Sequence, residues 1–282
     1  MCLLFGESVH GNVTIKKPKG PAHFVAIIKS KIQQSPTRWR TYVEDLHGRD
    51  IATIQGNGFG WPMKRSLKDH YNPIFAPALA QFFKSPSRIG LVEILLRNLP
   101  RKKSSTLEIL EDGAGEGIGL AKIVEQTKAS GIKVNATALT MAKNSVLEER
   151  ARASGFKVVT GPAELFVPKK KMDLIISLFG SIYFNATNFR GIYLAKDNLE
   201  KFAYSLKPNG VLMVAFKAKF ANGQSTEMNP EKTERFLQNL IKSFKKRNFR
   251  AEVFPFTNVE VEGPKPTHVL IIQRLPNLQR TK

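Results

Sequence analysis

The stretch "LEILEDGAGEGIGLAKIVEQ", residues 107–126, places four glycines between an apolar run and an amphipathic run. The apolar run "TLEIL" is typical of a buried strand, and "GLAKIVEQTKASG" is typical of a helix that ends at Gly131. The glycines therefore fall where a strand passes into a helix, the place at which an open α/β sheet binds its ligand. A Walker A phosphate loop is excluded, because no Gly-Lys-Ser/Thr follows. An acid just before the first glycine, Glu111 or Asp112, is suited to pair with a ligand ammonium.

Strand and helix patterns alternate through the rest of the chain. Strands are predicted at "KVNATAL", "FKVVTG", "MDLIISLF" and "GVLMVAF", and helices at "TMAKNSVLEERARASG", capped by Thr140, and "AKDNLEKFAYSLKPNG". An amphipathic helix, "PEKTERFLQNLIKSFKKRNF", then precedes two runs that suit an antiparallel pair, "RAEVFPFTNVEVE" and "THVLIIQRL". This order predicts an α/β fold, a doubly wound and mostly parallel sheet with an antiparallel C-terminal hairpin.

The first hundred residues differ in character. Pro and Gly recur at short intervals, which predicts only short helices or strands, with order expected at residues 25–32 and in "IGLVEILLRNLP". In the latter, Leu91, Ile94, Leu95 and Leu99 share a face that we expect to pack on the main sheet. We therefore divide the chain into an N-terminal accessory or substrate-side region (1–103), a main domain (104–275) and a tail (276–282).

Charge is the outlier of the composition. The 282 residues contain 44 Lys and Arg against 23 Asp and Glu, a formal net charge of +21 with a pI near 10.1. Such a charge attracts polyanions. Cys2 is the only cysteine, which excludes a disulfide within the chain and a thiolate metal cluster, and no metal site is expected. We expect neither a signal peptide nor a transmembrane helix, and a cytoplasmic location.

"LEILEDGAGEG" resembles the first motif of class I S-adenosylmethionine-dependent methyltransferases, an apolar strand, an acid, a spacer and G-x-G-x-G. "FKVVTGPAEL", "KKKMDLIISLFGS" and "FAYSLKPNGVLMVAF" resemble, in order, the third strand with its adenine loop, the fourth strand, and the helix, turn and fifth strand of that family. The resemblance covers roughly residues 104–275. It implies a seven-stranded Rossmann-like sheet and S-adenosylmethionine as cofactor.

The resemblance also implies which residues contact the cofactor: Glu111, Asp112, Gly113, Gly115, Gly117, Thr140, Ala163, Glu164 and Ser177. Two family positions depart from the pattern. The acid that usually holds the ribose hydroxyls is Leu139 here, so Thr140 either takes over that contact or only caps a helix. The usual Asp of the adenine loop is Pro162, and Glu164 either replaces it or is solvated.

The methyl acceptor and the catalytic residues stay open at this point. "SLFGSIYF" replaces the Asn/Asp-Pro-Pro-aromatic motif of base-amino methylating relatives, and only part of the 2′-O-methylating Lys-Asp-Lys-Glu set is present. Candidates for catalysis are Lys217 after the fifth strand, Tyr183 near the expected pocket mouth, and His70 as a base from the N-terminal region. Nucleic acid, RNA above all, is the preferred acceptor. A small-molecule or protein acceptor, and a non-catalytic RNA-binding or scaffold protein, are the alternatives.

Basic clusters suggest how a polyanion would be bound. Lysines and arginines gather at 101–103, 169–171 and 242–247, and we expect these clusters to form a positive rim. Trp39, Phe59 and Trp61 lie among basic residues of the N-terminal region, a composition typical of surfaces that stack bases. A packing role for these aromatics, and a solvated role for the lysines, are the alternatives.

Overall fold

The computed structural model describes residues 12–15, 29–34, 38–44, 50–57, 71–86, 88–99, 106–140, 145–160, 163, 166–178, 180, 191–216, 230–256 and 267–276. The main sheet has seven strands in the order β10-β11-β9-β8-β5-β6-β7. These strands are β5 (Leu107–Asp112), β6 (Val134–Thr140), β7 (Lys157–Thr160), β8 (Met172–Leu178), β9 (Leu206–Phe216), β10 (Phe249–Pro255) and β11 (His268–Arg274).

Strands β5 to β9 run parallel to one another, and β11 pairs antiparallel with both β9 and β10. The predicted mostly parallel sheet with an antiparallel C-terminal hairpin is therefore confirmed. Chain order reverses between β5 and β8, which are hydrogen-bonded neighbours although two strands and two helical segments separate them in sequence. This switch point places the ends of β5 and β8 on either side of the crevice in which open α/β sheets bind ligands.

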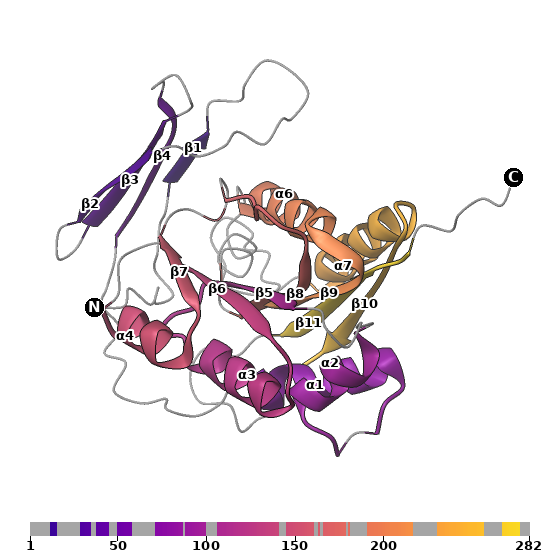
Figure 1. The fold of residues 1–282 in the computed structure, drawn as a ribbon. Helices are drawn as coiled ribbons and strands as arrows, with labels where there is room; N and C mark the ends of the chain where they lie inside the picture. The colour runs from indigo at the N-terminus through magenta and orange to yellow at the C-terminus, as the bar shows by residue number, and fades with distance from the viewer. Residues whose placement is uncertain are drawn as a thin grey trace, which may run out of the picture.

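Helices cover both faces of the sheet (Figure 1). On one face lie α1 (Tyr71–Phe83), α2 (Leu91–Asn98), α3 (Ile118–Ala129) and α4 (Ser145–Ser154); on the other lie α6 (Gly191–Tyr204) and α7 (Pro230–Lys245). Each face has its own apolar core. β5 contributes to both by alternation, because Ile109 packs toward α1 to α4 and Leu110 toward α6 and α7.

Helix α1, of 13 residues, is longer than the short elements that the frequent Pro and Gly of the first hundred residues predicted. The helix contains Pro77, and its fully buried side chains include Ile74, Phe75, Leu79 and Phe82. Packing of this apolar surface offsets the loss of one backbone hydrogen bond at the proline. Helix α2 packs in the same core, as predicted.

The N-terminal region contains a second sheet, with the order β1-β4-β3-β2 and antiparallel pairing throughout. Its strands are β1 (Asn12–Ile15), β2 (Lys29–Gln34), β3 (Arg38–Glu44) and β4 (Asp50–Asn57). Order was expected in this part of the region only at residues 25–32, which overlap β2. The other three strands escaped detection because Gly and Pro close to them mask the alternation of short strands.

Boundaries of one further helix differ from the prediction. Thr140 is the last residue of β6 rather than a helix cap, and α4 begins five residues later, at Ser145. No helix in the described part of the chain is both long and apolar enough to cross a membrane.

Candidate functional site

The glycine loop at the carboxyl end of β5 is the centre of the candidate site. Gly113, Gly115 and Gly117 have φ angles of 80°, 54° and 72°, in the left-handed region that favours glycine. The loop is tied to β6, since the Gly113 and Ala114 amides both donate to the Leu139 carbonyl, at 3.0 and 3.2 Å. It then passes directly into α3, whose first turn is closed by the hydrogen bond from Ala121 to Gly117.

The glycines of this loop have different surroundings. A Cβ at Gly117 would lie 2.6 Å from Leu147 Cδ1 and 3.0 Å from Phe156 Cζ, so this glycine serves packing against α4. A Cβ at Gly115 would meet no heavy atom within 4 Å. The backbone at Gly115 therefore has a left-handed conformation that other residues adopt only at a cost, and it lies beside open space, as expected where a loop receives a ligand.

Glu111 is the most unusual charged residue beside this loop. Its side chain is only 2% exposed and, by strand alternation, faces the α1 to α4 side, between the neighbouring strand residues Ala138 and Ile176. Its Oε2 atom has no hydrogen-bond partner. Burial, with a further contribution from the Asp112 charge, raises the pKa of the Glu111 carboxyl well above its ordinary value. A buried carboxyl with an unused oxygen is a receptor for a cationic ligand group.

Asp112 occupies the other side of the strand, at the switch point. Ser177, its partner in the pairing of β5 with β8, donates a hydrogen bond from Oγ to Asp112 Oδ2 at 2.8 Å, and both residues are buried. Gly180 comes so close that a Cβ there would lie 2.2 Å from the Asp112 carbonyl oxygen. Asp112, Ser177 and Gly180 therefore hold the ends of β5 and β8 together at the mouth of the crevice.

Leu139 and Thr140 end the next strand, β6. Leu139 is 1% exposed and packs in the core below α6 and α7, so it offers no polar group at the position of the family's ribose-binding acid. Thr140 follows it and is partly exposed. Thr140 is the polar side chain that the structure describes at this strand end.

A buried lysine, Lys201 on α6, reaches the segment expected to contact adenine. Its ammonium donates to the Ala163 carbonyl and, at 2.9 Å, to Asn198 Oδ1, and the residue is 2% exposed. Lys201 is hard to recognise as a site residue from the sequence, because it stands beside Phe202 and Ala203 in a buried part of the helix. The i, i+3 spacing of Asn198 and Lys201 was the available signal.

Arg150 on α4 holds the glycine loop from outside. Its guanidinium donates to the Glu116 carbonyl and lies 3.8 Å from the Glu116 carboxylate. Glu164, Pro162, Tyr183, Lys217 and His70 lie outside the described residues, as do Phe59, Trp61 and residues 101–103. In the part of the chain that the structure describes, no cluster of three metal-ligating side chains occurs.

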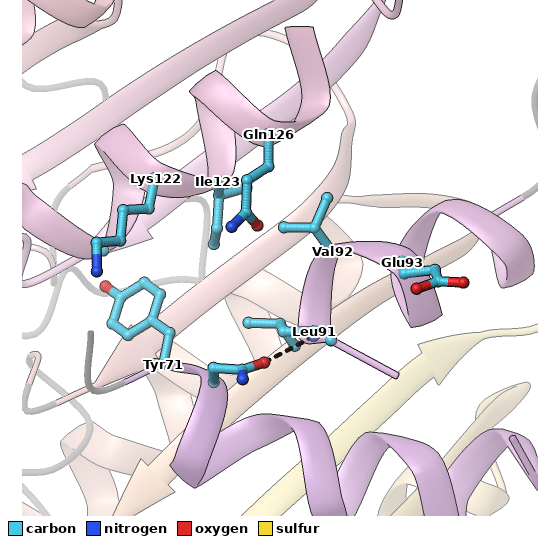
Figure 2. A pocket seen from close by; sticks show the side chains of 10 residues that line it. Tyr71, Leu91, Val92, Glu93, Lys122, Ile123 and Gln126 are labelled. Carbon is cyan, nitrogen blue, oxygen red and sulfur yellow. Dashed lines mark hydrogen bonds between the residues drawn. The ribbon is translucent and has the colours of Figure 1, made fainter. Parts of the chain in front are cut away.

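A separate cavity of about 300 Å³ opens between α1, α2 and α3 (Figure 2). Lys122, Gln126 and Glu93 bring polar groups to it, and Figure 2 shows the Tyr71 hydroxyl pointing toward the Lys122 amino group. A Cβ at Gly119 would lie 2.6 Å from the Tyr71 ring, so the start of α1 packs directly on the first turn of α3. Helix α1 therefore braces the glycine loop from behind.

Several solved structures with a similar arrangement are methyltransferases. A Listeria monocytogenes protein assigned to that class has a TM-score of 0.48 at 16% identity, over 76% of this chain and 64% of its own. An rRNA methylase from Streptococcus thermophilus has a TM-score of 0.44 at 13% identity, over 66% of this chain and 94% of its own. CalS10 is an amino pentose methyltransferase from Micromonospora echinaspora, solved with S-adenosylmethionine bound. It has a TM-score of 0.40 at 12% identity, over 66% of this chain and 97% of its own.

These likenesses concern the fold alone, since every identity is below 25% and every TM-score below 0.5. The chain spans just under two thirds of the length of the Listeria protein. No family model and no curated protein matches the sequence.

Proposed function

We propose that the chain binds S-adenosylmethionine at the glycine loop and transfers its methyl group to an acceptor. The observation that carries this proposal is the buried Glu111 carboxyl, whose Oε2 has no partner at the carboxyl end of β5. Such a group costs stability unless a ligand uses it. A cation placed there restores the ionised form of the carboxyl and completes the site.

The other residues of the site fit the same cofactor. Glu111 would hold the methionyl ammonium, the backbone around Gly115 would lie against the cofactor, and Thr140 would take the ribose in place of the acid missing at Leu139. The Ala163 segment, held by Lys201, would border the adenine. When bound, the cofactor supplies a methyl group already activated by a positively charged sulfonium, so the chain has mainly to position the acceptor.

For the acceptor we propose a nucleic acid, RNA in particular. The net charge of +21 supports this choice, because it concentrates polyanions around the protein. A small-molecule or protein acceptor is the alternative if RNA is not methylated.

A second candidate is a methyltransferase-fold protein that binds RNA without catalysis. The observation that favours it is Leu139, which is buried in the core where a ribose-binding acid would stand. Its test is the same as that of the main proposal.

Calorimetric titration with S-adenosylmethionine and S-adenosylhomocysteine tests the cofactor site. We expect both to bind, because both carry the ammonium and the adenosine, and Gly115→Val to abolish binding in a folded protein. No heat at high micromolar cofactor would favour the non-catalytic alternative. Transfer of a labelled methyl group to total RNA, compared with protein and a metabolite extract, then identifies the acceptor class.

A further inference from the structure

Basic residues gather along the amino-terminal ends of the parallel strands of the main sheet, on the side opposite the glycine loop. This row of strand ends is called the amino edge below. The parallel strands β6, β8 and β9 begin here. Lys133 and Lys171 come directly before β6 and β8, and Lys207 is the second residue of β9. Because β11 runs antiparallel to β9, it ends there, at Arg274, and β10 begins there just after Arg247. Five of the six strands from β10 to β6 thus carry a cation at the same edge.

Further cations flank this row. Helices α3 and α7 end at the same edge because each leads back to the start of a strand, and the turn before β8 contributes two lysines. We define the amino-edge surface by its ten basic residues: Lys128, Lys133, Lys169, Lys170, Lys171, Lys207, Lys245, Lys246, Arg247 and Arg274. In the described part of the chain, Glu108, Asp173 and Glu200 pair with Lys170, Lys207 and Arg247. A further acid, Glu125, accepts a hydrogen bond from the Ser154 hydroxyl beside Lys128.

Positive charge is crowded at the centre of this surface. The Lys171 ammonium and the Arg274 guanidinium both donate to the Tyr204 carbonyl, at 2.6 and 3.4 Å. Desolvation and the neighbouring Arg274 charge lower the pKa of Lys171. Within the described residues, Lys133, Lys169, Lys245 and Lys246 are all exposed and have no acidic partner within 4.0 Å. Much of the positive charge is therefore available to a partner.

An exposed aromatic ring lies among these cations. Tyr204, the last residue of α6, is 40% exposed, one of three large hydrophobic side chains exposed to that degree in the described structure. Its ring meets Phe249 edge to face at 5.4 Å, and its side chain interacts with Arg247. Cations arranged around an exposed aromatic ring are the composition of surfaces that bind single-stranded nucleic acids, where phosphates are neutralised and bases stack.

We propose that the amino-edge surface binds a single-stranded nucleic acid, with phosphates on the row of cations and a base stacked on Tyr204. Six strands at a spacing of about 4.8 Å give the row a length of about 24 Å, enough for several consecutive phosphates. The six residues of β5 separate it from the glycine loop by about 20 Å. The surface therefore anchors the nucleic acid away from the cofactor site, and its binding does not depend on the proposed methyl transfer.

Fluorescence anisotropy of the full chain with a labelled 20-nucleotide oligouridine tests this proposal. We expect the affinity to fall with salt, with a log–log slope of about −0.7 for each phosphate contacted. Lys133→Glu combined with Lys246→Glu should weaken binding at least tenfold. Lys246→Glu alone should weaken binding at least about threefold, and its matched control is Arg235→Glu, an exposed arginine about three turns earlier on α7, which should change the affinity by less than about twofold.

Two variants of Tyr204 test whether a base stacks on its ring. Tyr204→Ala should weaken binding by roughly fivefold or more through lost stacking, whereas Tyr204→Phe should retain it. A melting curve for each variant shows that α6 is still folded. Equal losses in Lys246→Glu and Arg235→Glu, preference for a duplex of the same length, or binding to anionic phosphatidylserine vesicles in place of oligouridine would each overturn the proposal. Cofactor titration of the same variants should be unchanged, so failure here is distinguishable from failure of the proposed function.

Discussion

Replacement of Glu111 by Gln should stabilise the free protein and weaken its cofactor binding at the same time. The Glu111 side chain is 2% exposed and its Oε2 has no hydrogen-bond partner. Above neutral pH the wild-type chain must either bury an unpaired charge or keep the carboxyl protonated against its intrinsic tendency. Glutamine has nearly the same shape and no proton to lose, so the substitution removes this cost.

The sign of the pH dependence follows from the raised pKa. Because the folded chain holds the Glu111 proton more tightly than the unfolded chain, whose pKa is near 4.5, the wild type loses stability as pH rises through the folded pKa. At or below the unfolded value, wild type and Glu111→Gln should melt at similar temperatures. At pH 8 the variant should be more stable by about 1–3 kcal/mol, a melting temperature roughly 3–9 °C higher.

Thermal melting monitored by circular dichroism from pH 4.5 to 8.5 measures this difference. Asp112→Asn is the control. It makes the same acid-to-amide change at the next residue, but the carboxylate that it removes accepts a hydrogen bond from Ser177, so this variant should be less stable than wild type. A melting difference independent of pH, or a Glu111→Gln variant less stable than wild type at pH 8, would refute the reasoning.

Cofactor binding is the second half of the same prediction. Loss of the charge-assisted contact with the methionyl ammonium should weaken S-adenosylmethionine binding by about 1.5–3 kcal/mol in Glu111→Gln. In the wild type, binding should release a proton, detected as a calorimetric enthalpy that depends on the ionisation enthalpy of the buffer. Unchanged affinity in Glu111→Gln together with a large loss in Asp112→Asn would transfer the role to Asp112.

Three further substitutions separate packing from binding. Gly115→Val should eliminate calorimetric binding of the cofactor in a protein that still folds, although it is less stable by about 1–2 kcal/mol because a φ of 54° is unfavourable for a β-branched residue; retained binding would place the site elsewhere. Gly117→Val should instead lower the stability of the free protein, by about 1–3 kcal/mol in urea unfolding, because its Cβ meets Leu147 and Phe156. Lys201→Met should weaken binding of the cofactor and of 5′-methylthioadenosine alike, because the Ala163 segment loses its anchor; a loss confined to the cofactor would argue against an adenine-side role.

The sequence by itself determined the class of the fold and indicated where the candidate site lies. Apolar runs of strand length that alternate with amphipathic helices leave only a sheet with helices on both faces, and each run is a local pattern set by backbone periodicity. The left-handed glycines were also readable, since no other residue adopts that conformation so cheaply. The position at the strand end named Glu111 or Asp112 as the ligand group, and that role stays a prediction.

Tertiary structure decided what depends on residues far apart in the chain. Helix α1 forms despite Pro77 because the core buries its apolar side chains, a gain that local propensity does not contain. The hydrogen bonds of Ser177 with Asp112 and of Lys201 with Ala163 exist only because strand order brings these segments together. The basic runs at 169–171 and 245–247 likewise meet on one edge, the edge opposite the glycine loop, because parallel strands all begin on the same side of a sheet.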